Sequence, residues 1–127
     1  MSTSARIARR PAAAERDGVI GPAAGALVCA RCGHRITRRE FLVAIDGRVA
    51  HTRTNPHGWT FSFHTFALAP GCVARGTPET AASWFPPRAW RLAHCAGCGD
   101  HLGWCFTAPG SRSYGLIDDC MREDEDA

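Results

Sequence analysis

Alternation of apolar and polar residues recurs along the middle of this chain and predicts short β-strands. A period of two is that of a strand with one face buried. The pattern occurs at residues 59–64, 89–94 and 102–106, where large apolar side chains mostly occupy every second position. No window of about 12 residues has the spacing of an amphipathic helix. We therefore predict a mostly β domain.

Turn signals separate these runs. Asp46-Gly47 adopts the positive φ of tight turns easily, so we expect a hairpin that joins strands at 41–45 and 48–51. Proline, glycine and asparagine gather at the other expected turns. These lie at residues 55–58, 70–71, 76–78, 86–87 and 109–110.

The length of 127 residues fits one domain. Residues 1–26 are rich in alanine, arginine and glycine without periodicity, and we expect a disordered N-terminal tail. Residues 121–127 are mostly acidic and are expected to form a solvated C-terminal tail, which leaves an ordered domain at 27–120. No signal-peptide core and no apolar run of ~20 residues is present, so a cytoplasmic chain without a membrane span is expected.

Charge adds little to this picture. The formal net charge is +3, and all 15 basic residues are arginine. They are dispersed along the chain, whereas a nucleic-acid surface concentrates them in a patch. We expect no nucleic-acid partner.

Two Cys-x-x-Cys pairs, each followed by glycine, carry the first chemical signal. They are Cys29 with Cys32, and Cys95 with Cys98. Four thiolates suit tetrahedral zinc, and the glycines relieve a crowded backbone after the second ligand. The alternatives are disulfides or a redox motif, but paired glycine-flanked knuckles favour one structural zinc that clamps distant parts of the domain.

Three further cysteines, Cys72, Cys105 and Cys120, lie outside this pattern. Free cysteine is usually a small core residue. The strand pattern places Cys105 on the face opposite Trp104, and the acidic residues beside Cys120 would raise its pKa. We expect no catalytic residue and no enzymatic activity.

Aromatic residues carry the second signal. Trp84, Trp90 and Trp104 fall within 21 residues, and the second cysteine pair lies between the last two. Three indoles that converge form a small apolar box. Such a box holds either a quaternary cation or a flat neutral ring.

These residues carry a family resemblance. The segments 83–90 and 95–106, the Cys29-x-x-Cys32 pair, the Asn55-Pro-His-Gly58 loop and the closing 114–117 together resemble the CULT domain family, which includes the thalidomide-binding domain of cereblon and single-domain bacterial homologues. The resemblance covers roughly residues 27–120.

The resemblance implies a β-tent fold of two antiparallel sheets that meet at a steep angle and are pinned by zinc. It also implies a ligand that is a cyclic imide, such as a glutarimide, a thalidomide-type compound or a uracil-like ring. The tryptophans would form the walls, Phe106 the base, and Asn55 and Pro56 a covering loop. The main chain at Ala82 and Trp84 would pair with the imide edge. The full expected ligand-binding set is Trp84, Trp90, Trp104, Phe106, Asn55, Pro56, Ala82 and Ser83.

The sequence also departs from that family. Ala81-Ala82 stands where cereblon has Glu-His, and Trp59 stands where it has tyrosine. The chain has no room for cereblon's protease-like domain or ligase-adaptor surface, so we expect a freestanding binding module and no ubiquitin-ligase partner.

Two alternatives stay open. One is a methionine sulfoxide reductase-like zinc enzyme, which needs a cysteine nucleophile at an aromatic pocket. The other is a methyl-ammonium reader, which would use a carboxylate beside the aromatic box to complement the cation. No acidic residue lies within three positions of Trp84, Trp90 or Trp104.

Overall fold

The computed structural model describes residues 25–124, and nearly all regular structure in this range is β. The first strands are β1 (Ala26–Cys29), β2 (Arg35–Arg38), β3 (Ala50–Thr54), β4 (Thr60–Phe66) and β5 (Cys72–Glu79). The remaining strands are β6 (Ala89–Cys95), β7 (His101–Ala108), β8 (Ser111–Ile117) and β9 (Met121–Glu123). Within the described range, the helical elements are two 3-10 turns, η1 (Arg39–Phe41) and η2 (Asp118–Cys120). The predicted mostly β class is confirmed.

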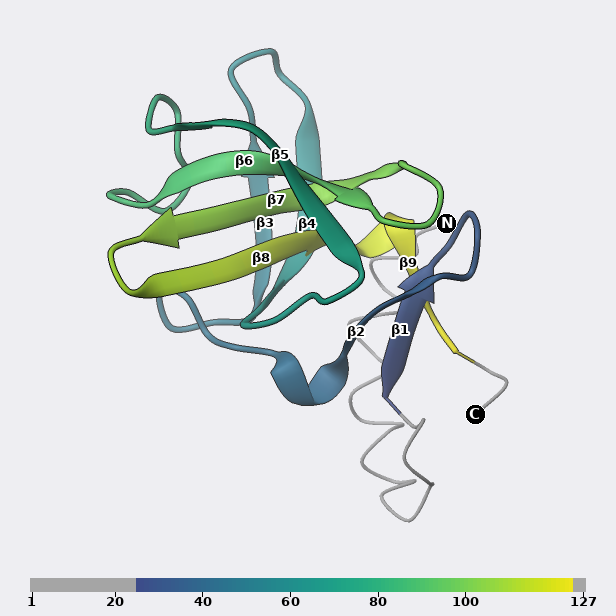
Figure 1. The fold of residues 1–127 in the computed structure, drawn as a ribbon. Coiled ribbons are helices and arrows are strands. Elements are labelled where there is room, and N and C mark those ends of the chain that lie inside the picture. The colour runs from purple at the N-terminus through teal and green to yellow at the C-terminus, as the bar shows by residue number, and fades with distance from the viewer. Residues whose placement is uncertain (1–24, 125–127) are drawn as a thin grey trace.

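The strands form two antiparallel sheets. The larger has the order β3-β4-β8-β7-β6-β5, and the smaller has the order β2-β1-β9. Figure 1 shows that β3 and β4 run steeply across the direction of β6, β7 and β8, and that β1 and β9 lie beside the larger sheet. The expected pair of antiparallel sheets is therefore present.

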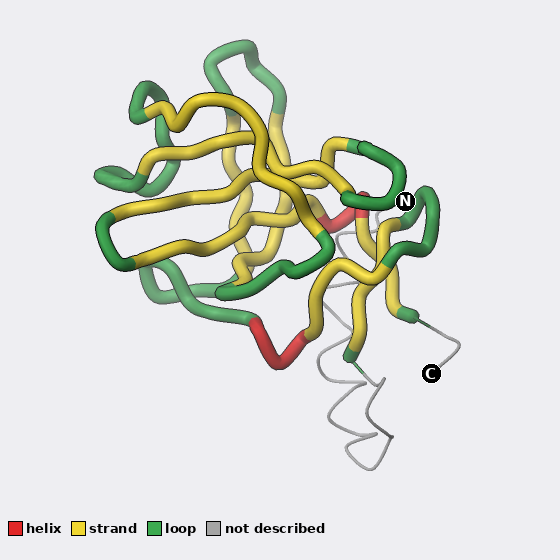
Figure 2. Tube along the Cα trace, in the orientation of Figure 1, coloured by secondary structure: helices red, strands yellow, loops and turns green. Residues whose placement is uncertain are grey.

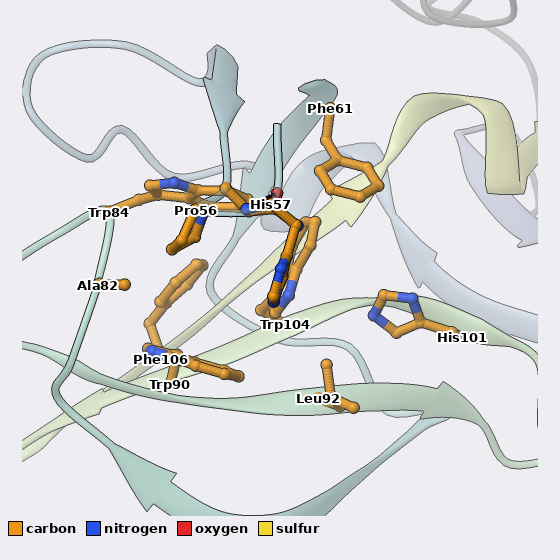
Figure 3. A pocket seen from close by; sticks show the side chains of 11 residues that line it. Pro56, His57, Phe61, Ala82, Trp84, Trp90, Leu92, His101, Trp104 and Phe106 are labelled. Carbon is orange, nitrogen blue, oxygen red and sulfur yellow. Dashed lines mark hydrogen bonds between the residues drawn. The ribbon is translucent and has the colours of Figure 1, made fainter. Parts of the chain in front are cut away.

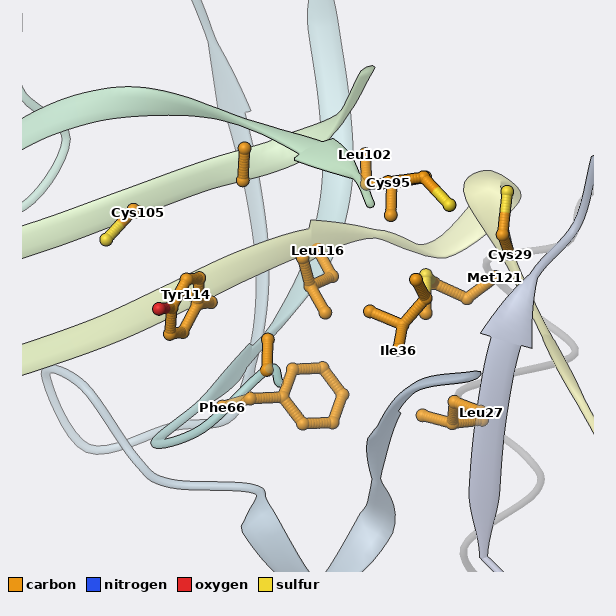
Figure 4. Packing of buried hydrophobic residues seen from close by; sticks show 12 residues of the cluster. Leu27, Cys29, Ile36, Phe66, Cys95, Leu102, Cys105, Tyr114, Leu116 and Met121 are labelled. Carbon is orange, nitrogen blue, oxygen red and sulfur yellow. The ribbon is translucent and has the colours of Figure 1, made fainter. Parts of the chain in front are cut away.

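The buried side chains fall into two clusters. The first lies between the sheets, where residues of the small sheet such as Leu27 and Ile36 meet Phe66, Cys105 and Leu116 of the large one. Figure 4 shows these side chains converging from both sheets. The second cluster lies around the aromatic residues Phe63, Phe85, Trp104 and Phe106, with Ile45. Together the two clusters use both faces of β7.

A bulge in β7 divides its side chains between the two clusters. Alternation predicts Leu102, Trp104 and Phe106 on one face, but Leu102 belongs to the first cluster and the other two belong to the second. The pairing with β6 shifts between Ala93 and His94, which leaves Leu102 as the extra residue. Gly103, at φ +159°, permits the bulge, because a Cβ there would lie 1.9 Å from the Gly115 carbonyl oxygen.

The predicted hairpin at 41–51 is correct at its turn but wrong in its first strand. Asp46 and Gly47 have φ of +54° and +83°, and the Ile45 and Arg48 main chains exchange hydrogen bonds of 3.0 and 3.2 Å. The preceding residues form η1 and then an irregular segment, of which Leu42 bridges to Phe66. Figure 2 shows the η1 turn where the chain leaves the small sheet. The chain pairs here with β4 and therefore cannot form a continuous hairpin strand.

The ends of the domain differ from the predicted boundaries. Nearly all of the predicted tail at 1–26 lies outside the described residues, but Ala26 begins β1. The first acidic-tail residues form β9, which pairs with β1. There Glu123 forms an ion pair with Arg39, and Asp124 lies 2.8 Å from Arg35 Nη2. Arginines of β2 and η1 therefore hold acidic residues at the end of β9 and just after it, which composition alone assigns to solvent.

No helix in the described range is long and apolar enough to cross a membrane.

Candidate functional site: a cysteine cluster and an aromatic pocket

The two Cys-x-x-Cys turns have the same main-chain geometry. The N–H of Gly33 donates to the Cys29 carbonyl at 2.8 Å, and the N–H of Gly99 donates to the Cys95 carbonyl at 2.8 Å. Both glycines are left-handed, with φ of +82° and +83°. Only a residue without a Cβ adopts this conformation without cost. Each glycine therefore folds its turn so that both thiols of the pair face the same side.

The four thiols meet between the two sheets. Cys29 ends β1 and Cys95 ends β6, so each sheet contributes one strand end and the turn that follows it. The Sγ atoms all lie within 4.8 Å of one another. Those of Cys29 and Cys98 are 3.8 Å apart, and those of Cys32 and Cys95 are 3.7 Å apart. This group can hold a metal ion.

Burial and backbone donors act on the thiols in opposite directions. Burial raises the pKa of the Cys29 thiol to about 12. At Cys95 burial also raises the pKa, but the N–H groups of Cys98 and Gly97 and the thiols of Cys32 and Cys98 together outweigh it, so the net pKa is lowered. The Gly97 N–H lies 3.3 Å from the Cys95 sulfur. Four thiolates at this spacing repel one another, so their joint ionisation requires a bound cation.

The second part of the site is a pocket of about 280 Å³ on the other face of the β6–β7 hairpin. This is just below the ~300–1,000 Å³ range of most ligand pockets, so a single small ring fits it best. In Figure 3, Trp84, Pro56 and His57 lie across the pocket from Trp90 and Leu92. The lining residues are Asn55, Pro56, His57, Phe61, Ala82, Trp84, Trp90, Leu92, His101, Trp104 and Phe106.

Hydrogen bonds fix two of the three indoles. The Trp84 Nε1–H donates to the Thr54 carbonyl at 3.2 Å, and the Trp90 Nε1–H donates to the Ala81 carbonyl at 2.8 Å. The Trp84 and Trp104 rings meet edge to face, with centroids 4.8 Å apart and planes at 79°. Their indole faces are thus held in place before any ligand arrives.

The main chain beside the indoles keeps unused polar groups. Ala82 has φ +59°, and neither Ala82 nor Trp84 makes a main-chain hydrogen bond with any other described residue. Ala82 is exposed and Trp84 is half-buried, so their unpaired main-chain groups are accessible to a ligand. The segment can present an N–H and a carbonyl to one edge of a ring.

The Asn55 side chain is used mainly within its own loop. Its Oδ1 accepts the N–H groups of His57 and Trp59, both at 2.9 Å. Asn55 thereby fixes the loop that brings Pro56 and His57 over the pocket. Trp59 is 67% exposed and does not line the pocket.

Most of the expected ligand-binding set meets at this pocket, with one exception. Ser83 does not line it, and its hydroxyl instead accepts the Phe85 N–H at 3.2 Å. The expected set did not include four other residues that line the pocket, which are His57, Phe61, Leu92 and His101. Alternation indicated the face of Phe61 and Leu92, but only the register of β4, β6 and β7 brings them to one place.

The lining carries no fixed charge opposite the indoles. Among the described residues, those that line the pocket include no carboxylate and no cysteine. Burial lowers the pKa of His101, so its ring stays neutral at pH 7. The pocket offers apolar ring faces and neutral hydrogen-bonding groups.

The three remaining cysteines lie away from the pocket. Cys105 is fully buried in the first cluster, behind the Trp104 face, as the strand pattern predicted. Burial raises the pKa of Cys72 to about 12 and that of Cys120 to about 11. Cys72 and Cys120 therefore stay protonated at neutral pH and lie outside the pocket, so neither serves there as a catalytic nucleophile.

Fold and site together define a small two-sheet β domain with a cluster of four cysteines that can hold a metal ion, and with a separate aromatic pocket. The chain is similar to protein cereblon from several animals. It is 39% identical over 85 residues to protein cereblon of Gallus gallus, a match that covers 65% of this chain and 19% of that protein. The Danio rerio protein is 36% identical over 85 residues, with 65% and 20% covered. The Drosophila melanogaster protein is 29% identical over 83 residues, with 63% and 14% covered.

These matches confirm the resemblance indicated by the sequence: the chain contains a cereblon-like CULT domain. The matched stretch spans about a fifth of the length of these vertebrate relatives. No protein-family model matches the chain.

Proposed function

We propose that this domain binds the ring of a cyclic imide, as a glutarimide or a uracil-like compound, and catalyses no reaction. The supporting observation is that one pocket contains three indoles together with main-chain groups of Ala82 and Trp84 that make no hydrogen bond with another described residue. The edge of an imide ring presents a carbonyl oxygen, an N–H group and a second carbonyl oxygen side by side, which act as acceptor, donor and acceptor. Neutral main-chain groups complement that edge, and the indoles supply apolar contact.

The alternatives fit the pocket less well. A methyl-ammonium ligand gains most from a nearby carboxylate, and a sulfoxide reductase needs a reactive thiol at its pocket. The described lining offers neither group. Both activities are included in the test below.

The metal is proposed to be one structural zinc ion held by Cys29, Cys32, Cys95 and Cys98. Zinc–thiolate bonds of ~2.3 Å in a regular tetrahedron place the sulfurs about 3.8 Å apart. The separations of 3.8 and 3.7 Å match this edge. When bound, zinc supplies no chemistry at the pocket, because all four positions are filled by protein thiols. Its effect is to join the sheets.

The proposal is tested by titrating the chain with glutarimide, thalidomide, N-methylglutarimide, uridine and trimethyl-lysine while following tryptophan fluorescence, and by incubating the chain with methionine sulfoxide and a thiol reductant. We expect glutarimide and thalidomide-type compounds to quench the signal. N-methylation should weaken binding at least about fivefold, because the lost donor leaves a main-chain acceptor unpaired at ~1–3 kcal/mol. Equal binding of both imides would reject main-chain recognition. Binding of trimethyl-lysine alone, or reduction of methionine sulfoxide, would reject the ligand class.

A further inference from the structure

A fifth cysteine lies directly beside the metal cluster. Cys72 begins β5 and is paired with Cys95 of β6 in the register of the large sheet. Residues directly opposite in antiparallel strands project to the same side of the sheet. Both side chains accordingly pack in the cluster between the sheets. Cys72 is not one of the four residues of the cysteine cluster.

The two cysteines form a non-hydrogen-bonded cross-strand pair. The Cys72 N–H donates to the Ala69 carbonyl at 3.0 Å, and the Cys95 N–H donates to the Asp100 carbonyl at 2.8 Å. The neighbouring N–H of Ala96 donates to the Gly71 carbonyl at 2.9 Å. The Cα atoms of a non-hydrogen-bonded pair are ~4.5 Å apart, which falls within the ~4.4–6.8 Å range of disulfides. A disulfide between Cys72 and Cys95 therefore needs no change of register.

The cluster also has an exposed point of entry for an oxidant. Cys32 and Cys98 are exposed, whereas Cys29 and Cys95 are buried. The Cys32 and Cys95 sulfurs are 3.7 Å apart. An oxidised Cys32 is consequently within reach of Cys95, and Cys95 in turn faces Cys72.

We propose that Cys72 and Cys95 form a disulfide when the domain meets a peroxide, and that this bond removes Cys95 from the metal cluster. The Cys32 thiolate first attacks hydrogen peroxide, giving a sulfenic acid and hydroxide. The Cys95 thiolate then displaces a second hydroxide and forms the Cys32–Cys95 disulfide. Cys72 loses its proton and attacks the Cys95 sulfur, which releases Cys32 as a thiolate. Cys72 and Cys95 together lose two electrons, and one peroxide becomes two water molecules after protonation.

The product differs from a disulfide within the cluster in its accessibility. A bond to Cys32 stays at the surface, whereas a Cys72–Cys95 bond lies between strands in the core. Exchange with an external thiol depends on access to the sulfur, so the buried bond is reduced more slowly. Three thiols then remain for the metal. This inference rests on the proposed zinc, and it makes metal occupancy depend on oxidation.

The test begins with the zinc content of the reduced full-length chain, because a chain without zinc would reject the metal assignment and leave the disulfide to be tested alone. One equivalent of hydrogen peroxide is then added, zinc release is followed with a colorimetric chelator, and free thiols are alkylated. Trypsin places Cys72 in the peptide 54–75 and Cys95 in the peptide 92–112. We expect these two peptides to be cross-linked, with fragment ions that place the bond at Cys95.

Two variants complete the test. Cys72→Ser should bind zinc normally and lose the cross-link, and glutathione should restore its zinc binding roughly tenfold faster than in the wild type. Cys105→Ser is the matched control, because Cys105 lies in the same core but is paired with Arg91 and Tyr114. It should keep the cross-link. Disulfides confined to the four cluster cysteines in the wild type, or equal recovery of the wild type and Cys72→Ser, would overturn the proposal.

Discussion

The cysteine cluster and the aromatic pocket draw on the same β6–β7 hairpin but are built in different ways. The cluster consists of Cys95 and Cys98 at the turn of this hairpin and of Cys29 and Cys32 at an equivalent turn after β1. The pocket takes residues from the middle of β6 and β7 and completes itself with the β3–β4 loop and the segment before β6. One site is a repeated local motif, and the other is assembled from distant segments.

This difference separates stability from recognition. All four sulfur atoms of the cluster would coordinate the same metal ion. The cluster can therefore hold the sheets together, but it leaves no coordination position for a ligand. The pocket keeps an open volume beside the indoles, and the main chain of Ala82 and Trp84 makes no hydrogen bond with another described residue. Changes at the cluster should therefore affect folding, whereas changes at the pocket should affect binding.

The largest effect is expected from removing a cluster thiol. Cys29→Ser, or chelation of the metal, should abolish cooperative unfolding, because coordination by four thiolates contributes on the order of 10 kcal/mol, comparable with the whole stability of a domain. Thermal unfolding followed by circular dichroism measures this. Cys105→Ala is the control, since it removes a buried thiol that is not in the cluster. Full stability of metal-free wild type would break the distinction between the two regions.

A change at the backbone that both regions share should have the next largest effect. In Gly103→Ala the new Cβ would lie 1.9 Å from the Gly115 carbonyl oxygen, so β7 and β8 must separate. We expect a loss of about 3 kcal/mol in the free energy of unfolding. Gly110→Ala is the control, because its Cβ meets nothing within 4 Å although its φ is +71°. Chemical denaturation should show a loss of only about 1 kcal/mol for this control.

A change in the pocket should lower affinity while leaving the fold intact. Trp90 is half-buried, and its ring lies on the face of β6 opposite Cys95 and the first buried cluster. In Trp90→Ala we expect glutarimide affinity to fall by ~1–3 kcal/mol, as for a lost stacking ring. Calorimetric titration measures the affinity, and zinc content should not change. Trp59→Ala is the matched control, and an equal loss there would contradict the assignment of the pocket.

The sequence predicted the cysteine cluster better than the aromatic pocket, because the cluster is a local motif and the pocket is assembled from distant segments. The cluster could be predicted from spacing alone, because each Cys-x-x-Cys-Gly turn is local and its glycine has a specific conformational role. The alternation of Trp104 and Phe106 also predicted their shared face. Leu102 could not be placed, because the bulge depends on the close approach of Gly103 to Gly115 on another strand. Phe61 and His101 reach the pocket only through strand pairing, which no local pattern encodes.

The strand at β9 shows the same limit. Composition assigned residues 121–123 to a solvated acidic tail, but Met121 is buried and Glu123 pairs with Arg39. Charge composition describes a segment in isolation, whereas here the opposite charge is supplied by a residue more than 80 positions earlier.

The smallest effect is expected at Ala82. Its φ of +59° costs an L-residue more than glycine, so Ala82→Gly should raise stability by about 0.5 kcal/mol after the entropy of the unfolded chain is included. Because recognition at this position is proposed to use the main chain, glutarimide affinity should change less than about twofold. Thermal unfolding and titration of the same sample measure both. A large loss of affinity would show that the Ala82 methyl group itself contacts the ligand.

The most direct measurement of the central claim is an NMR titration of the four indole N–H resonances in ¹⁵N-labelled, zinc-loaded chain. On addition of glutarimide, the resonances of Trp84, Trp90 and Trp104 should shift, while that of the exposed Trp59 should not. The amide N–H of Ala82 or Trp84 should shift with them, and N-methylglutarimide at the same concentration should produce little change. Equal shifts with both compounds, or shifts confined to Trp59, would contradict recognition of an imide edge by the main chain within the aromatic pocket.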